Sequence, residues 1–301
     1  MMIDRRTLLL APLAVSATGA YAAGAEPMML TVARYNLSPA GWPADLALSI
    51  AAIADVHACD PWMSVAHIER IVDATNALKP DLVVLLGDYV AGHRKISAVV
   101  PDREWARALA RLKAPLGVYA ILGNHDWWAD HEAMVRGRGP IAARVALERA
   151  GVPVLENECV RCIKGGKPFW LAGLGDQEAF SRTARGGGVD DLQRTLAAVT
   201  DDAPVILLAH EPDIFPKTPR RIALTLAGHT HGGQVRVFGI APVAPSPLSR
   251  RYLQGHFVEQ DRHLIVSGGL GCTWWPVRVG VPPEIVQVEL GPGAPPLLPS
   301  A

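Results

Sequence analysis

Between residues 29 and 290, short apolar runs alternate with stretches in which apolar residues recur at helical spacing. Mainly apolar runs such as 46–54 and 82–86 predict buried strands. Ser64, a residue type that caps helix N-termini, opens an amphipathic stretch that ends before Pro80 and predicts a helix. By the same criteria, further strands are expected near 117–122, 152–155, 158–163, 168–173, 205–208, 222–226, 234–238, 252–258, 263–267 and 285–290, and further helices near 103–112, 141–149 and 189–199.

The order of these elements indicates the fold class. Strands and helices alternate in the first part of the chain, whereas the last four strands follow one another and are expected to form hairpins. This order predicts an α/β fold with some α+β character, in which two packed sheets are covered by helices. One globular domain over residues 26–290 is the simplest organisation, and the Pro/Gly/Ala-rich residues 291–301 are expected to form a disordered tail.

The first 25 residues differ from the rest. The pair Arg5-Arg6 precedes a short apolar run at residues 8–15, and small residues follow up to Ala20-Tyr21-Ala22. This is the pattern of an export leader with an A-x-A cleavage site, and the paired arginines are typical of twin-arginine signals, which export folded proteins. The run is short for a membrane span of about 20 residues. We therefore expect the protein in the periplasm or cell envelope, with an uncleaved N-terminal membrane tether as the alternative.

Charge and cysteine usage exclude several classes of protein. Lys and Arg number 29 and so do Asp and Glu, and the chain contains no basic run, so no nucleic-acid surface is expected. Of the four cysteines, Cys159 and Cys162 have the spacing of a redox pair or half a zinc site. They fall on a predicted strand, where residues i and i+3 face opposite ways, and a structural role is favoured.

Polar residues that can bind metals follow the apolar strands. Five of the ten histidines lie at such positions. In open α/β sheets, ligands collect at the carboxyl ends of strands, so we expect these side chains to meet. His229 and His231 would face one site because residues i and i+2 of an extended chain point to the same side. The candidate metal ligands are Asp55, His57, Asp88, Asn124, His210, His229 and His231, with His125 beside them.

Seven oxygen and nitrogen donors are more than one metal ion needs. A tetrahedral zinc takes three or four protein ligands, whereas seven, including a carboxylate that can bridge, suit two ions roughly 3.5–4 Å apart. Carboxylate, amide and imidazole donors without thiolate favour manganese, iron or zinc over copper. The sequence thus predicts two divalent ions without choosing among these three metals.

The ordered motifs resemble those of the calcineurin-like metallophosphoesterase superfamily. The pattern is D-x-H, G-D, G-N-H-D, a lone histidine after an apolar strand, and G-H-x-H, and five motifs in order are far more specific than any one of them. In this chain they are Asp55 and His57, Gly87 and Asp88, Gly123 to Asp126, His210, and Gly228 to His231, within a resemblance that covers about residues 47–290. The resemblance implies a four-layer αββα sandwich of two mixed sheets flanked by helices.

The resemblance also implies roles for these residues. One metal would be held by Asp55, His57 and His231, the other by Asn124, His210 and His229, with Asp88 bridging them. The ions would provide a hydroxide for in-line attack on phosphorus. His125 would assist the leaving group, and Asp126 would orient His125 or another supporting group. Substrate contacts are expected from Asn124, His125, Gly232 and Gly233.

Within the superfamily, this chain is similar to exported or membrane-associated bacterial members that contain G-H-T-H-G-G-Q and a late Pro-Pro-Glu segment. These motifs lie at residues 228–234 and 282–284. The resemblance implies a phosphodiesterase that acts on a phosphoester or nucleotide-pyrophosphate substrate, with a lipid-linked substrate and peripheral membrane contact left open. The alternative is hydrolysis of UDP-2,3-diacylglucosamine in lipid A biosynthesis, although that substrate is handled on the cytoplasmic side. A non-catalytic metal-binding scaffold is a third reading. Many members carry G-D-x-x-D, but Ala91 replaces the second carboxylate. This departure removes no metal ligand.

Several tryptophans fall in expected loops near the motifs. Two readings of them stay open: they line an apolar groove for acyl chains or a base, or they pack long loops over the site. These residues are Trp62, Trp127, Trp128, Trp274 and Trp275.

Overall fold

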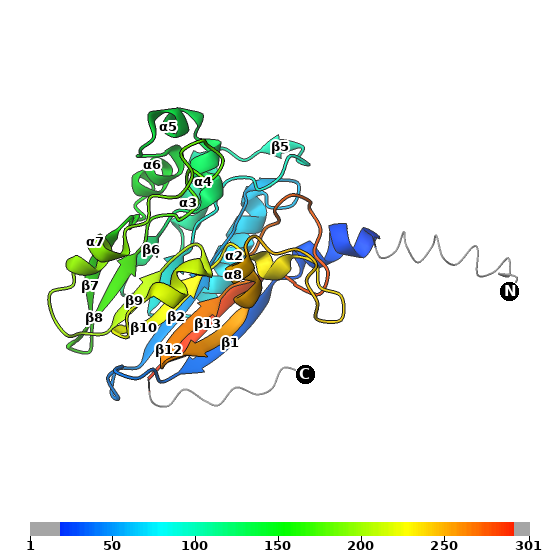
Figure 1. Ribbon diagram of the computed structural model, residues 1–301. Helices are drawn as coiled ribbons and strands as arrows, with labels where there is room; N and C mark the ends of the chain where they lie inside the picture. Colours follow the sequence, from blue (N-terminus) through cyan, green and yellow to red (C-terminus); the bar gives the residue numbers. More distant parts are fainter. Residues whose placement is uncertain (1–18, 292–301) are drawn as a thin grey trace, which may run out of the picture.

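Two mixed sheets face each other and helices cover their outer faces (Figure 1). The computed structural model describes residues 19–291, so residues 1–18 of the predicted leader and the tail from residue 292 lie outside it. The first sheet has the order β1 (Thr31–Leu37), β13 (Glu284–Leu290), β2 (Leu48–Ile53), β4 (Leu82–Leu85), β6 (Val118–Ala120). The second has the order β11 (Gly255–Glu259), β12 (Arg262–Val266), β10 (Ile222–Ala227), β9 (Val205–Leu208), β8 (Lys167–Gly173), β7 (Glu158–Lys164).

Helices lie on the outer face of each sheet. The first sheet packs against α2 (Val65–Ala77), α3 (Asp102–Leu109), α4 (Asn124–Ala129), α5 (His131–Arg136) and α6 (Ala142–Arg149), around a core that includes the fully buried Trp105. The second packs against α7 (Leu192–Ala197), α8 (Pro247–Arg251) and the 3-10 helix η3 (Pro212–Lys217). Aliphatic side chains such as Ile50, Val84 and Leu224 fill the space between the sheets. The predicted four-layer sandwich is confirmed.

The sequence pattern misplaced several strands. Residues 285–290 do not form a hairpin: β13 inserts into the first sheet between β1, to which it is parallel, and β2, to which it is antiparallel. Strand β1 was not expected, because its residues are mostly half-buried or exposed and lack a continuous apolar run. Near 152–155 and 234–238 only isolated bridges form. A pairing partner distant in sequence decides these cases, and local periodicity does not report it.

The N-terminal segment packs against the domain. It contains the short helical turns η1 (Tyr21–Ala25) and η2 (Glu26–Met28). The carbonyl of Ala22 accepts from the backbone N–H of Arg278 at 2.8 Å, and Oε1 of the buried Glu26 accepts from the N–H of Val281 at 2.7 Å. The folded domain therefore extends upstream of residue 26, and removal of the leader at that boundary stays a prediction. Within residues 19–291, no helix is both long enough and apolar enough to cross a membrane.

Cys159 and Cys162 lie on β7 as free thiols, and Cys162 is buried. Burial raises the pKa of Cys162 to about 11, and Cys59 has the same value for the same main reason. Because the thiolate is the reactive form, a rise of two pKa units lowers its fraction near pH 8 about a hundredfold.

We expect a maleimide to label Cys159, which is only half-buried, before the other cysteines. Labelling of Cys162 should increase as the pH rises towards 11 or when the protein is unfolded. Fast labelling of Cys162 at pH 7 in the folded protein would contradict this assignment, and a Cys159→Ser variant identifies the first site.

Candidate metal centre

The polar residues that follow β2, β4, β9 and β10 meet at one edge of the sandwich. Strands β2 and β4 are parallel neighbours in the first sheet, and β9 and β10 are parallel neighbours in the second, so each pair delivers its carboxyl ends together. The loop after β2 is fixed to the loop after β4 by backbone hydrogen bonds from Asp55 N to Gly87 O at 3.1 Å and from His57 N to Asp88 O at 2.9 Å. The seven predicted ligands come together at this edge, and all are buried.

The backbone at the site is not extended, which corrects the predicted reason for the convergence of His229 and His231. Strand β10 ends at Ala227, and the two histidines then adopt the left-handed region. That region costs a non-glycine residue of order 1 kcal/mol. Five of the seven candidate ligands share it: Asp55 (φ 54°), His57 (φ 49°), Asp88 (φ 60°), His229 (φ 69°) and His231 (φ 51°). Backbone strain, and not strand alternation, aims these side chains inward.

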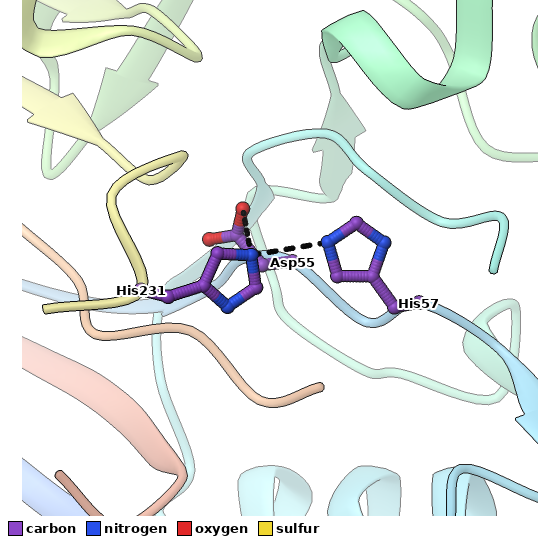
Figure 2. A group of neighbouring side chains, drawn as sticks. All are labelled: Asp55, His57 and His231. Atoms are coloured by element: carbon purple, nitrogen blue, oxygen red, sulfur yellow. Dashed lines mark hydrogen bonds and ion pairs between the residues drawn. The ribbon is translucent and has the colours of Figure 1, made fainter. Parts of the chain in front are cut away.

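Asp55, His57 and His231 form one group of donors (Figure 2). Nε2 of His57 lies 3.1 Å from Nε2 of His231, and Nε2 of His231 lies 3.7 Å from Oδ1 of Asp55. The Asp55 carboxylate also accepts from the backbone N–H of His229 at 3.0 Å, which ties the loop after β10 to the loop after β2.

Asn124, His210 and His229 form the second group. Oδ1 of Asn124 lies 3.1 Å from both Nε2 of His210 and Nδ1 of His229. Between the groups, Oδ2 of Asp88 lies 3.5 Å from Nε2 of His57 and 3.4 Å from Nε2 of His210. One carboxylate oxygen is thus shared by two sets of three donors.

The hydrogen-bond partners of the imidazoles show that this donor set fits cations. Nδ1 of His57 donates to Val90 O at 2.8 Å and Nδ1 of His210 donates to Leu86 O at 2.7 Å, so Nε2 of each ring faces the site. In neutral His57 that atom carries a lone pair, and it faces a second imidazole nitrogen 3.1 Å away on His231. At His210 the facing atoms are carboxylate and amide oxygens, which only accept. Acceptor atoms that converge in this way must share a proton or a metal ion, and imidazole, carboxylate and amide groups can bind either.

The titratable groups of the site differ in the direction in which burial and neighbouring charges shift their pKa values. Burial raises the pKa of Asp55 to about 7, and burial lowers the pKa of His57 and of His231, so these two imidazoles are neutral. Burial opposes the charge on Asp88, but the neighbouring His210 and His125 outweigh it and hold the pKa of Asp88 well below its usual range. In the same way, Asp88 overcomes burial and raises the pKa of His210. Asp88 is therefore a carboxylate that stays ionised within the buried site.

Small residues let the loops approach. A Cβ on Gly123 would lie 2.3 Å from Oδ1 of Asp88, and Gly87 has a φ of +95° with the backbone N of Gly123 only 2.6 Å from its would-be Cβ. Only glycine fits at either position. The G-D and G-N-H-D motifs thus carry glycine because their loops touch.

Asp126 supports the centre through the backbone and does not contact His125. Its carboxylate accepts from the N–H groups of Asp88 at 2.9 Å, Tyr89 at 2.8 Å and Gly123 at 2.9 Å. These partners are backbone N–H groups and not the His125 ring, and the part that Asp126 plays in catalysis stays a prediction. Asp126 holds the loop that places Asp88 opposite the loop that places Asn124.

His125 projects into a cleft that opens over the two donor groups. Its Nε2 lies 3.4 Å from Oγ1 of Thr273, and its ring packs on His57 and on Trp128, each with 4.9 Å between ring centroids. Burial lowers the pKa of His125 to about 3, so it enters the site as a neutral imidazole whose N–H can donate. The cleft measures about 670 Å³, and Asp88, Asn124, His229 and His231 contribute to its walls.

Some predicted contacts lie elsewhere. Gly233 lines the cleft, but Gly232 is buried and faces Gln254 and Val281. Trp127 packs in the core against Phe180, and Trp62 donates to the carbonyl of Ala23. The tryptophans that line the cleft are Trp128, Trp274 and Trp275.

Sequence reasoning missed several charged residues at the site, among them Glu178, Arg182 and Arg278. Glu178 and Arg182 line the cleft, and the guanidinium of Arg182 lies 3.5 Å from the centroid of the Trp128 ring. Arg278 is fully buried behind His231, with Nη2 3.4 Å from Nδ1 of that histidine. No local motif marks these residues. The nearest feature that the sequence offered was the pair Trp127-Trp128, which directly follows Asp126.

Residues 48–233 match the calcineurin-like phosphoesterase family, a stretch that contains all seven donors. The chain belongs to this family. As a calcineurin-like phosphoesterase it is a metal-dependent phosphoric ester hydrolase, and the His/Asp groups described above are the residues that can hold its metal.

Relatives of this phosphoesterase include bacterial and animal proteins. It is 28% identical over 302 residues to the uncharacterized metallophosphoesterase YkuE of Bacillus subtilis, which covers 96% of this chain and 98% of the relative. It is 30% identical to the putative metallophosphoesterase F40B5.2 of Caenorhabditis elegans, over 81% of this chain and 48% of that protein. It is 29% identical to a transmembrane protein with metallophosphoesterase domain of Danio rerio, over 81% and 53%. The chain thus spans nearly the whole Bacillus relative but about half of the two animal ones.

Proposed function

We propose that this phosphoesterase is a dinuclear phosphodiesterase. The observation that carries the proposal is the sharing of Oδ2 of Asp88 between two sets of three donors, 3.5 Å from His57 and 3.4 Å from His210. One ion for each set, with Asp88 between them, uses all seven side chains. When bound, two divalent ions would supply a hydroxide nucleophile at neutral pH and neutralise phosphoryl oxygens.

The shape of the cleft supports a diester in preference to a monoester. Besides candidate donors, the residues that line it include Trp128, Arg182, Trp274, Trp275 and Val277, and its volume is about 670 Å³. A phosphorus atom at the donor groups would therefore have room for more than one substituent.

The residues of the chain that are not donors have roles in this proposal. The N–H of His125 would donate to the oxygen of the leaving group, and Thr273, at 3.4 Å, would help to orient the ring. Asp126 fixes the backbone that carries Asp88 and Asn124, so the distances between donors do not depend on substrate. Arg182 is placed to neutralise an anionic group at the mouth of the cleft.

A metal-reconstituted activity screen tests the proposal. Protein loaded with Mn²⁺, Fe²⁺ or Zn²⁺ should hydrolyse an aryl phosphodiester faster than the matching phosphomonoester, and a chelator should lower the rate at least about a hundredfold. Elemental analysis should find about two ions per chain, and re-addition of metal should restore activity. Activity unchanged by a chelator that removes the metal would refute the proposal, and a monoester preference would refute its diester part.

The same screen decides between this substrate class and the nucleotide-pyrophosphate alternative. Release of UMP from a diacylated UDP-sugar at a higher kcat/KM than any diester would favour the alternative. Location provides an independent test, because a reporter fused after Ala301 should be active outside the cytoplasm if the leader exports the protein. If the reporter is active only in the cytoplasm, the protein is on the side where the lipid precursor is handled, and its location no longer argues against that substrate.

A further inference from the structure

Exposed apolar side chains gather around the mouth of the cleft. Within residues 19–291, fourteen large hydrophobic residues are exposed, and ten of them belong to three segments beside the cleft. We call these segments the apolar rim: residues 21–29, 237–248 and 274–275. The exposed members are Tyr21, Met28, Met29, Val237, Phe238, Ile240, Val243, Leu248, Trp274 and Trp275. Phe238 is 100% exposed and Trp274 is 73% exposed.

Backbone hydrogen bonds join the segments of the rim. Arg236 N donates to Val279 O at 2.7 Å and Val279 N donates to Gln234 O at 3.0 Å, which binds the residues just before the second segment to the stretch after the third. That stretch is bound in turn to the first segment by the bond from Arg278 N to Ala22 O. Figure 1 shows the N-terminal segment on the same side of the molecule as the loops around 235–245 and 272–277. The rim is therefore one connected feature, although its segments are distant in sequence.

Basic side chains accompany the rim. Arg94 and Lys95 are exposed, and Nζ of Lys95 lies 5.1 Å from the centroid of the Trp275 ring. Arg182 stands at the cleft, and Arg250 is exposed beside Leu248. Among the described residues, none of these four cations is within ion-pair distance of a carboxylate. Their charge remains available to an anionic partner.

We propose that the apolar rim docks on a lipid bilayer that contains anionic phospholipids, with the mouth of the cleft at the level of the headgroups. Tryptophan and tyrosine favour the membrane interface because their rings are apolar at one end and polar at the other. Unpaired lysine and arginine beside them add attraction to anionic headgroups. The described chain begins at Gly19, beside the rim, and the apolar run at residues 8–15 of the predicted leader immediately precedes it. A leader held at a membrane would bring this face to the membrane.

Brominated lipids provide a test that works in the full chain, where the leader is the same in every variant. Bromine quenches tryptophan fluorescence only at close contact, and Trp274 and Trp275 are the exposed tryptophans of the described chain. Vesicles of brominated phosphatidylcholine and phosphatidylglycerol should quench the wild type. A Trp274→Ser/Trp275→Ser variant should lose most of that quenching, which assigns the signal to the rim. Pure phosphatidylcholine or high salt should weaken the quenching several-fold.

A variant outside the catalytic machinery separates docking from folding. Phe238→Asn should lower the affinity for anionic vesicles roughly tenfold. Asparagine tolerates the left-handed backbone of Phe238 (φ 51°), so the fold should remain. Val135→Asn is the matched control, because Val135 is 76% exposed on α5, away from the rim, and should bind like the wild type. Hydrolysis of a soluble aryl diester should not change in either variant. If the wild type does not hydrolyse this diester at all, the result counts against the proposed function and leaves the docking result intact.

Three outcomes would overturn the inference. The first is a wild type that shows no quenching with anionic vesicles. The second is equal vesicle affinity for the wild type and Phe238→Asn. The third is a wild-type dimer in light scattering that Phe238→Asn converts to a monomer without vesicle binding, because the rim would then be covered by a second copy of the chain.

Discussion

Replacing Asp88 with asparagine is expected to lower kcat/KM by at least about a thousandfold and to reduce bound metal below two ions per chain. Oδ2 of Asp88 lies between the two histidine sets, 3.5 Å from Nε2 of His57 and 3.4 Å from Nε2 of His210. Asparagine removes the negative charge there, and its amide presents a donor or a neutral oxygen in place of a carboxylate. The other carboxylate oxygen accepts from the N–H of His125 at 2.8 Å, a bond that the amide oxygen can keep.

The fold should survive this change, because asparagine tolerates the φ of 60° that Asp88 adopts. Asp191→Asn is the matched control. Asp191 caps α7 by accepting from Arg194 N at 2.8 Å, and asparagine caps helices equally well. Steady-state kinetics and elemental analysis on both variants provide the comparison. An Asp88→Asn protein with two ions and wild-type kinetics would show that Asp88 bridges nothing.

Replacing His125 with alanine is expected to lower kcat about 100- to 1000-fold while metal content stays at the wild-type level. The ring of His125 projects into the cleft and packs on His57, and its backbone N–H, which alanine keeps, donates to Oδ1 of Asp88. The loss should depend on the leaving group. A phenyl ester, which needs a proton as it departs, should suffer more than a nitrophenyl ester, which does not.

His131→Ala is the control for this variant, since His131 is exposed at the start of α5. A brief comparison of kcat for two esters on the three proteins is enough. Equal losses for both leaving groups would mean that His125 stabilises charge on the phosphoryl oxygens and does not assist departure.

The sequence predicted which seven candidate donors come together, but not the reason for their convergence. Motif order identified the seven donors, and the alternation of an extended chain was the expected cause of the pairing of His229 with His231. The structure instead places both in left-handed backbone beyond the end of β10. A local sequence pattern reports which strand a residue follows. It does not report the turn that the chain makes when two loops pack against each other.

In the fold, too, the sequence pattern predicted some features and not others. Apolar runs located β2, β4, β9 and β10, which are buried on every residue or nearly so. They did not locate β1, because a sheet edge needs no continuous apolar run, or the insertion of β13 beside it, because that pairing joins residues about 250 positions apart. The residues that line the cleft were harder still to predict from the sequence. Arg182 and Thr273 reach it from loops whose paths depend on packing at a distance.

Because five candidate ligands adopt left-handed backbone, the supply of metal should affect how long the folded protein survives. Five backbone positions at the centre hold conformations that each cost of order 1 kcal/mol. An ion that binds the folded chain offsets these costs, and each tenfold rise in free metal above its dissociation constant adds about 1.4 kcal/mol per site to the free energy of unfolding. The compartment in which the chain first meets its metal would therefore set how long it survives as well as how fast it works.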